Sequence, residues 1–319
     1  MSEAILGIDV AKKKFDVALI FDGKTLARKF DNSPKGFKLL QGWLMSLHLE
    51  RVRACMEATG TYGEELAEFL YAKNHRVAVV NPLRIKGYAN ADLKRNKTDP
   101  ADAYLIADFC LVKDPDDWHP MSAEAKHLQA LTRRIEALEQ MLVAEKNRLD
   151  VAPREVRPSV KRIIKTLETE IKNVHRLIKE HFDDNPDMKQ QNDLLLTIPG
   201  IGQKTSQLLL SEVEFRKYTS ARAVAAQAGL TPRKDQSGTS LNRTRLSKVG
   251  NVRIRKALYL PAMVALKHNQ TIKQFASRLS QLGKTPMQVI CAAMRKLLHI
   301  AFGVIKNNRP FDPNLACPT

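Results

Sequence analysis

The first third of the chain alternates short apolar runs with turn and helix signals. Residues 4–10 and 15–21 are runs rich in Ile, Val, Leu and Phe, and Asp22-Gly23 then supplies a hairpin turn before residues 24–31. Two more strand-like runs follow, separated by segments with apolar residues at helical spacing. The resulting order, β-β-β-α-β-α-β-α, predicts a mixed α/β domain and differs from the strict alternation of a doubly wound fold.

Residues 120–182 carry a narrow apolar stripe with charged flanks. Apolar residues recur there at three- and four-residue intervals along two segments, separated by a break at Pro153 and Pro158. This pattern predicts a coiled-coil hairpin or an intermolecular coiled coil, and the alternative is two amphipathic helices on a globular core. The stripe consists of Leu128, Leu131, Ile135, Leu138, Leu142 and Leu149, followed by Val160, Ile164, Leu167, Ile171, Val174 and Ile178.

Two apolar helical stretches flank a glycine-containing turn in residues 194–212. Gly200 and Gly202 allow the backbone to turn tightly and to approach a phosphate, and Lys204 falls in the first turn of the second helix. This pattern predicts a helix-hairpin-helix element that contacts phosphate. A Gly-rich turn between two helices, with no ligand, is the alternative.

Charge is distributed unevenly along the chain. The net charge is +18 over 319 residues, and residues 216–319 hold 19 Lys and Arg against 2 Asp and Glu. Such a concentration is the electrostatic footprint of a polyanion-binding domain, whereas a membrane-surface protein would show one basic amphipathic helix. We therefore predict an α/β domain at 1–115, a helical coiled-coil connector at 116–187 and a basic, mostly α-helical domain at 188–319.

The apolar runs and the cysteine spacing indicate where in the cell the protein is expected. No uninterrupted apolar run approaches the ~18 residues that span a bilayer, and the first apolar run has the wrong flanking charges for a secretory signal. The 4 cysteines lie far apart, without a CxxC pair, so neither a disulfide framework nor a zinc site is indicated. We expect a protein of a reducing cytoplasm, with no membrane partner.

Four acidic residues form the first candidate site. Asp9 and Glu57 end two strand-like runs, and Asp99 and Asp102 lie at the start of a predicted helix. Strand ends of a mixed sheet bring distant side chains together, and i,i+3 spacing places two carboxylates on one helical face. Clustered carboxylates repel one another, and Mg²⁺ or Mn²⁺ neutralises them and assists phosphodiester chemistry. Four unrelated surface acids, with Asp99 as an N-cap, are the alternative.

The segment around Gly238 forms the second candidate site. It carries several hydroxyl groups amid basic residues, which can neutralise a phosphate and stabilise its pentavalent transition state. No histidine lies nearby to support a hydrolase triad. A Ser/Gly-rich loop between basic segments is the alternative interpretation. The hydroxyl residues are Ser237, Thr239, Ser240 and Thr244, and the basic residues are Arg233, Arg243, Arg245 and Lys248.

Several motifs resemble, in the same order, those of the DEDD transposases of insertion sequences. They are GIDVAKKKFDV, EATGTY, RNKTDPADA, IPGIG, GLTPR and QSGTS. The family is the IS one-ten family, which is related to the pilin-gene DNA invertases and described as bridge-RNA-guided recombinases. The resemblance runs essentially from end to end of the chain. The joint occurrence of RNKTDPADA and the later SG-containing segment is specific, whereas a GxD or a PGIG alone would be weak.

The resemblance implies a fold, a chemistry and site residues. It implies an N-terminal RuvC-like domain with an RNase H-type sheet, whose acidic quartet matches Asp9, Glu57, Asp99 and Asp102 and binds Mg²⁺ or Mn²⁺. It implies a C-terminal transposase domain with a nucleophilic serine, matched by Ser237. That serine attacks a DNA phosphodiester and leaves a covalent 5′-phosphoserine link, and the quartet assists from a neighbouring subunit.

The resemblance also implies partners and a location. Donor and target DNA pair with a structured guide RNA, the bridge RNA, and the coiled coil joins dimers into a synaptic tetramer. The location is the bacterial cytoplasm, with nucleoid association when DNA is bound. We expect the following residues to bind DNA or RNA: Lys94, Arg95, Lys97, Gly200, Gly202, Lys204, Arg233, Arg243, Arg245, Lys248, Arg253 and Arg255.

Two other classes of function stay open on the sequence. In a RuvC-like structure-selective nuclease, the acidic quartet activates water and the serine segment only binds. In a non-catalytic nucleic-acid-binding protein, the quartet is degenerate. Protein trapped on DNA through a serine ester is expected for the transposase alone.

Overall fold

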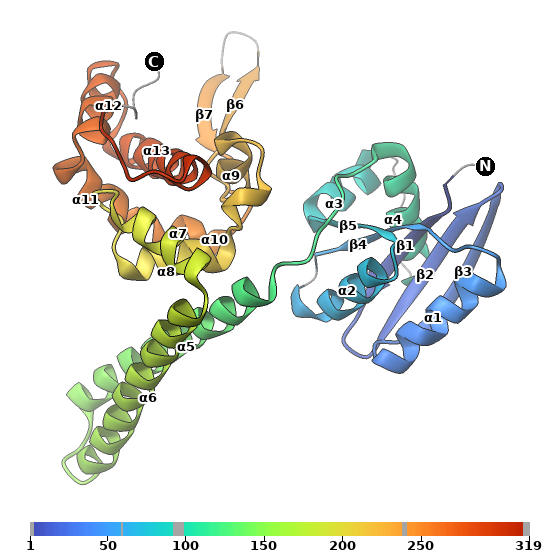
Figure 1. Cartoon of the computed structure of the whole chain (residues 1–319), viewed down its shortest axis with the longest axis horizontal. Coiled ribbons are helices and arrows are strands. Elements are labelled where there is room, and N and C mark those ends of the chain that lie inside the picture. The colour runs from blue at the N-terminus through green and yellow to red at the C-terminus, as the bar shows by residue number, and fades with distance from the viewer. Residues whose placement is uncertain (1–2, 59, 92–98, 238–240, 315–319) are drawn as a thin grey trace. The chain divides into compact units, whose positions relative to one another are not determined.

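The computed structural model describes residues 3–58, 60–91, 99–237 and 241–314. The chain divides into two compact units, Met1–Pro120 and Met121–Thr319, which Figure 1 shows in blue to green and in green to red. The predicted helical connector and the predicted basic domain both fall largely inside the second unit.

A five-stranded mixed sheet forms the centre of the first unit. The strand order is β3-β2-β1-β4-β5, with β1, β2 and β3 antiparallel and with β4 and β5 parallel to β1. This arrangement confirms the predicted mixed α/β architecture and the hairpin at Asp22-Gly23. The strands are β1 (Ile5–Val10), β2 (Lys14–Phe21), β3 (Lys24–Asp31), β4 (Arg53–Glu57) and β5 (Arg76–Val80).

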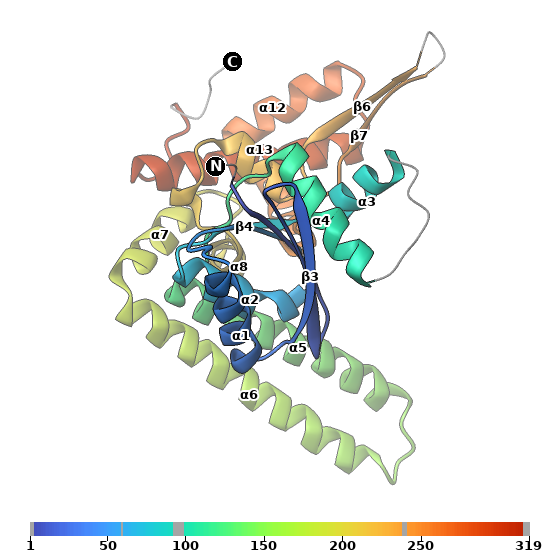
Figure 2. The same cartoon turned by 90° about the vertical axis from the view of Figure 1, so that its right-hand side faces the viewer.

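Alternating side chains of this sheet build two separate cores, because successive residues of a strand point to opposite faces. Leu6 and Ile8 pack with apolar residues of α1 (Pro34–Ser46) and α2 (Glu64–Ala72). Ile5 packs on the other face with α3 (Pro82–Ala91) and α4 (Asp99–Lys113), and Figure 2 shows the two helix pairs on opposite sides of the sheet. A 3₁₀ turn, Gly60–Gly63, precedes α2.

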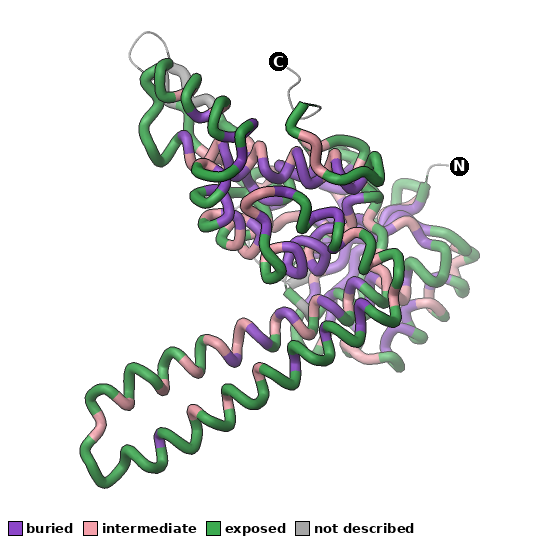
Figure 3. Tube along the Cα trace, turned by 60° about the vertical axis from the view of Figure 1, so that its left-hand side comes forward, coloured by how far each residue is buried: buried purple, intermediate pink, exposed green. Residues whose placement is uncertain are grey.

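Two long antiparallel helices, α5 (Ala123–Val151) and α6 (Arg157–Asp184), begin the second unit and form the helical hairpin seen in Figure 3. The apolar stripe is buried near the rest of the unit, and toward the tip of the hairpin most of its residues are half-buried, whereas Val160 is buried. The two helices therefore occupy the predicted segments. Their supercoiling and their pairing with a second chain stay predictions.

Short helices surround α13 (Pro286–Asn307), whose residues Leu297, Leu298 and Ala301 are fully buried in the core of the second unit. The helices of this core supply apolar faces, as the sequence predicts for residues 257–305. They are α7 (Pro186–Leu196), α8 (Gln203–Glu212), α9 (Ala221–Gln227), α10 (Val252–Ala257), α11 (Tyr259–His268) and α12 (Gln270–Gln281), with a 3₁₀ turn at Phe215–Lys217.

An antiparallel β-ribbon emerges from this helical unit where the sequence suggests only a loop. It pairs β6 (Pro232–Ser237) with β7 (Leu241–Leu246), and Figure 1 shows it projecting from the helices. Its strands alternate among polar and charged residues, so the apolar period that identifies a half-buried strand is missing. The hydrophobic pattern of the sequence therefore does not predict this ribbon.

One described helix, α13, has the length and apolar composition of a membrane span. Half of its most apolar window is buried inside the second unit, as in the core helix of a globular fold. Composition alone therefore gives weak support for a span.

Candidate catalytic residues in the two units

Asp9 and Glu57 lie at the same level on neighbouring strands. The parallel register of β1 and β4 pairs Gly7 with Cys55 and Ile8 with Met56, and one further step brings Asp9 beside Glu57. Both follow the parity of Gly7 and Cys55, so both belong to the sheet face that α4 covers. That these two carboxylates act together in one site stays a prediction.

Helix α4 runs antiparallel to β1 and places its first turn over these strand ends. Gly7 lies directly beneath Ala103 and Ala107, and Arg53, the first residue of β4, forms an ion pair with Asp114, which follows the last residue of α4. The helix thus proceeds from the carboxyl end of the strands toward their amino end. Its first turn carries Asp102, which is half-buried, and Asp99 is its first residue, with a side chain outside the described set.

A further carboxylate, which the sequence analysis missed, lies beside Asp9. The antiparallel register of β1 and β2 places Asp16 directly opposite Asp9, and Asp16 is 6% exposed. Lys29 of β3 forms an ion pair with Asp16, with 3.2 Å between Nζ and Oδ1. The signal was present in the sequence, because a hairpin that follows Asp9 must bring a residue of the next strand opposite it.

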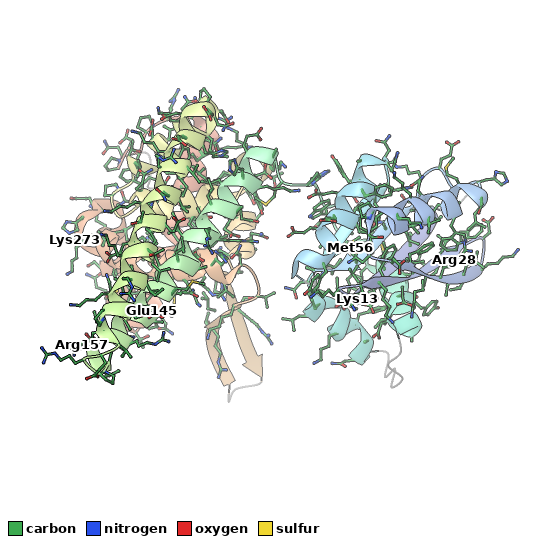
Figure 4. The ribbon with its side chains drawn as sticks, turned by 90° about the horizontal axis from the view of Figure 1, so that it is seen from below. Lys13, Arg28, Met56, Glu145, Arg157 and Lys273 are labelled. Atoms are coloured by element: carbon green, nitrogen blue, oxygen red, sulfur yellow. The ribbon has the colours of Figure 1, made fainter. Side chains whose placement is uncertain are left out.

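Two exposed lysines, also missed, occupy the turn that follows Asp9. The Ala11 backbone N–H donates to the Lys14 carbonyl at 2.9 Å and closes the turn, which leaves Lys12 and Lys13 at its corner. Lys13 is labelled in Figure 4. These ammonium groups lie at the end of the sheet that carries Asp9.

The donor set at this edge suits a hard divalent cation. Asp9, Glu57 and Asp102 offer carboxylate oxygens from β1, β4 and α4, and such oxygens are the ligands that Mg²⁺ and Mn²⁺ prefer. Among the side chains that the structure describes, no group of three or more Asp, Glu, His or Cys residues is close enough to hold an ion. The side chain of Asp99, the fourth member of the predicted quartet, lies outside that set.

Ser237 is the last residue of β6, at the far end of the ribbon. The register pairs Ser237 with Leu241, and the residues between them, 238–240, lie outside the described residues together with the candidate hydroxyls Thr239 and Ser240. Thr244, the fourth candidate, faces Lys234 further down the ribbon. The backbone thus presents Ser237 at the tip, away from the core that anchors the ribbon.

The strand register sorts the predicted arginines by their distance from Ser237. Arg233 pairs with Arg245, and Asp235 pairs with Arg243, so all of these positions share the ribbon face of Ser237. At about 3.3 Å per residue, Arg233 lies about 13 Å along the strand from Ser237. The Arg233–Arg245 pair therefore lies about two phosphates away along a nucleic-acid strand, and Arg243 is the nearest arginine on that face.

The base of the ribbon is fixed by a tight backbone junction. Gly229 has φ +67°, and an added Cβ would meet Arg255 Nη1 at 2.4 Å. Arg255 Nη1 donates to the Ala228 carbonyl at 2.9 Å, and Lys248, which has φ +57°, hydrogen-bonds Gly229 through its backbone. Arg255, predicted to bind nucleic acid, thus holds the junction, whereas the Lys248 side chain is exposed.

Three of the other predicted contacts are engaged within the second unit. Gly200 has φ +108°, and an added Cβ would lie 2.8 Å from Ala265 Cβ, so this glycine serves close packing against α11. Lys204 forms an ion pair with Glu139 of α5. Arg253 binds Glu136 and Glu212.

The remaining predicted contacts are Gly202 and three basic residues that precede α4. Gly202 is the N-cap of α8 and has open space around its Cα. Lys94, Arg95 and Lys97 lie outside the described residues. Helices α7 and α8 pack together around the glycine turn, but their role as a phosphate-binding helix-hairpin-helix stays a prediction.

Comparisons with known proteins match both units. A family model described as "Transposase", for DEDD transposases of the IS110 type, matches residues 6–158, and the model "Transposase IS116/IS110/IS902 family" matches residues 192–277. Both models therefore define the class as insertion-sequence transposases. The pilin gene-inverting protein of Moraxella bovis is 35% identical over 99% of this chain and 99% of its own.

Other relatives agree. The pilin gene-inverting protein of Moraxella lacunata is 35% identical over 99% of both chains, and the Yersinia enterocolitica transposase for insertion sequence element IS1328 is 26% identical over 97% of this chain and 98% of its own. The chain belongs to the IS110 family, and it is a DNA transposase/recombinase. Among solved structures, T. thermophilus RuvC in complex with a Holliday junction substrate matches 37% of this chain and all of its own, at 13% identity and TM-score 0.27.

Proposed function

We propose that this transposase cuts and rejoins DNA through a covalent 5′-phosphoserine intermediate on Ser237, assisted by the acidic quartet Asp9, Glu57, Asp99 and Asp102. The observation that carries the metal part of the proposal is the register of β1 and β4, in which Ile8 pairs with Met56, the residues that precede Asp9 and Glu57. The resemblance supplies the role of the serine. Its position at the end of a projecting ribbon suits a group that must reach into a DNA strand.

The acidic edge is the expected metal site. Asp9, Glu57, Asp99 and Asp102 would hold Mg²⁺ or Mn²⁺, which when bound withdraws charge from the phosphoryl oxygens and from the leaving oxygen. The carboxylates of the chain set the position of the ions. Lys12 and Lys13, at the mouth of this edge, would hold the flanking phosphates.

The chemical step at Ser237 is a phosphoryl transfer. The Oγ–P bond forms as the P–O3′ bond breaks, the serine proton passes to a base, and the 3′-oxygen leaves with a proton. The arginine nearest Ser237 on the ribbon face, Arg243, stabilises charge on the phosphoryl oxygens. The Arg233–Arg245 pair holds a phosphate further along and sets the register of the strand.

Partners follow from the resemblance and from charge. Donor and target DNA, and a guide RNA that pairs with both, would lie against the basic second unit, and the quartet would act from a neighbouring protomer. The half-buried apolar stripe toward the tip of α5 and α6 would be completed by another protomer in a dimer and then a tetramer. With sequence choice assigned to RNA pairing, the chain needs no reader helix of its own.

A strand-transfer assay with matched variants tests this proposal. Ser237→Ala and Asp9→Asn should each reduce strand transfer to below detection, because removal of a nucleophile alone costs about a million-fold. Binding of the same DNA should persist. Thr244→Ala on the ribbon, and Asp22→Asn at the opposite end of the sheet, should retain activity.

The outcome separates the candidate functions. Strand transfer by Ser237→Ala protein would reject the serine intermediate. Hydrolytic cutting that needs Asp9 but not Ser237 would instead favour the structure-selective nuclease.

A further inference from the structure

The second unit contains a pocket of about 810 Å³ between α9, the C-terminal half of α13 and the segment that follows α13. Residues 296, 299, 300, 303, 304 and 307 line it from α13, at intervals of three and one that describe a single helical face. Residues 309–312 close it from the other side. The pocket shares no residue with the acidic edge or with the β6–β7 ribbon.

The pocket is positively charged. Lys296 and Arg309 line it, and their side chains make no hydrogen bond or ion pair with any residue that the structure describes. The one carboxylate among its lining residues, Asp312, accepts a hydrogen bond from the Asn314 backbone N–H at 2.8 Å. These two cations are therefore available to an anion from outside the chain.

His299 adds a buried nitrogen that lacks a partner. Its Nε2 is hidden from solvent and has no hydrogen-bond partner among the described residues. Burial, and then the charges of Arg295, Lys296 and Arg222, lower the pKa of His299 to about 4, so the imidazole is neutral near pH 7. A ligand atom that forms a hydrogen bond with His299 Nε2 would give this nitrogen a partner.

The rest of the wall is apolar and partly aromatic. Phe302 and Phe311 line the pocket and are half-buried, and Ile300 and Val304 line it as buried residues. Aromatic faces next to phosphate-binding cations are the combination that holds an unpaired nucleotide, because the base stacks while its phosphate is neutralised. A base inside a duplex is already stacked and offers no free face.

We infer that this pocket binds an unpaired nucleotide of a DNA or RNA strand, with its phosphate at Lys296 and Arg309 and its base against Phe302 and Phe311. This extends the proposed function by assigning a single-strand site within the basic unit. It rests on nucleic-acid binding alone and requires neither Ser237 nor a metal ion. The pocket can therefore fail to bind a nucleotide while strand transfer through Ser237 is confirmed. Equally, the pocket can bind a nucleotide while the serine mechanism is rejected.

The test compares binding of short single strands with binding of a blunt duplex hairpin. Fluorescent oligothymidylate, oligouridylate and a DNA hairpin are titrated with the full chain in EDTA over a range of salt. The double variant Lys296→Gln/Arg309→Gln should weaken single-strand binding about tenfold and reduce the salt slope by about 0.7, which is the contribution of one single-strand phosphate contact. Phe302→Leu keeps apolar bulk and should weaken single-strand binding about tenfold through lost stacking.

A matched control removes the same charge elsewhere in the unit. Lys273→Gln/Lys284→Gln changes two exposed lysines outside the pocket, and Figure 4 labels Lys273 on the outer surface of its unit. This variant should weaken binding of strands and duplex equally and only slightly. Arg309 is exposed and follows the last helix, so Arg309→Gln alone keeps the test valid if Phe302→Leu unfolds.

Three results are decisive. Selective loss of single-strand binding supports the site, and a greater loss for oligouridylate or for oligothymidylate identifies the strand as RNA or DNA. If the pocket variants and the control variant bind single strands equally well, the proposed nucleotide site is wrong. Equal loss of duplex and single-strand binding also overturns it, because the pocket would then be one more phosphate contact. Cross-linking of a 5-iodouracil strand to peptide 296–312 provides a direct readout of the same contact.

Discussion

At Gly7, the backbones of β1 and α4 come so close that a side chain cannot fit between them. A Cβ there would lie 2.2 Å from the Ala103 carbonyl oxygen. The contact fixes the height of α4 above the sheet and hence the position of Asp102, the residue just before Ala103 on α4, relative to Asp9. A residue without chemistry of its own thus sets the geometry of the acidic edge.

Gly7→Ala should push α4 off the sheet. We expect it to destabilise the first unit by about 1–3 kcal/mol through overpacking and to reduce strand transfer more than DNA binding. Gly42→Ala is the control, because Gly42 lies within α1 with open space around its Cα, and alanine there should stabilise by up to about 1 kcal/mol. Denaturant unfolding and the strand-transfer assay measure both effects. Unchanged activity and stability in Gly7→Ala would contradict this geometry.

His75 makes the stability of the first unit depend on pH. Its Nδ1 accepts from the Val52 N–H at 3.2 Å, its Nε2 hydrogen-bonds Gln41 Oε1 at 2.8 Å, and the side chain is 3% exposed. Burial, and then the charge of Arg51, lower the pKa of His75, so the folded state holds the neutral ring. The unfolded chain binds the proton more readily, and stability is lost as pH falls below about 6.5, by at most about 1.4 kcal/mol per pH unit.

Unfolding of wild type and His75→Gln between pH 7.5 and 5 measures this linkage. The variant should be less stable at pH 7.5 and lose less stability on acidification. His48→Asn, at an exposed position with positive φ, serves as the control and should follow the wild type. A slope in His75→Gln equal to that of the wild type would show that other groups cause the pH dependence.

At the scale of elements, sequence patterns predicted the helices and strands that bury apolar side chains. The strands, α4 and the long helices α5 and α6 were found because Ile, Val and Leu recur along them with the periods of a strand or a helix. The ribbon β6–β7 was missed because Arg233–Arg245 and Asp235–Arg243 are cross-strand pairs of polar residues. Asp16 was missed because its proximity to Asp9 depends on strand pairing, which spacing along the chain does not show.

The tip of the α5–α6 hairpin offers a test of self-association. Met141 on α5 and Ile163 on α6 are 50% and 49% exposed. Met141→Lys/Ile163→Lys should lower the mass of the oligomer in light scattering and leave the helix content unchanged, because exposed positions tolerate charge. Thr166→Lys/Thr169→Lys adds the same two charges at exposed sites on α6 and should preserve the oligomer. Identical masses for both variants would argue against pairing through these apolar positions.

At the scale of the whole molecule, the basic charge is concentrated at one end of the chain. Residues 216–319 carry 19 of the 52 Lys and Arg and only 2 of the 34 Asp and Glu. The charge count alone predicted a polyanion-binding domain at this end of the chain. It could not predict that Lys204 and Arg253 form ion pairs within the unit, since Glu139, Glu136 and Glu212 approach them only in the fold.

Mixed oligomers test whether the two units act in trans. Asp9→Asn and Ser237→Ala protomers should each be inactive alone, and co-expression should restore part of the strand transfer, because an intact quartet can then serve an intact serine on a different protomer. The comparison is a mixture of Ser237→Ala with an Asp9→Asn/Ser237→Ala double variant, which should stay inactive. Failure of the first mixture, with oligomers formed, would place both groups on one protomer.

The most direct test of the central claim is isolation of the covalent intermediate. Strand transfer on 5′-labelled and 3′-labelled DNA is stopped with denaturant, and the protein–DNA adduct is digested and sequenced by mass spectrometry. We predict a phosphodiester link between Ser237 and the 5′ end of the cut strand, absent in Ser237→Ala and in Asp9→Asn and present in Thr244→Ala. Cut DNA that is free of protein in every case, or an adduct at another residue, would contradict the account.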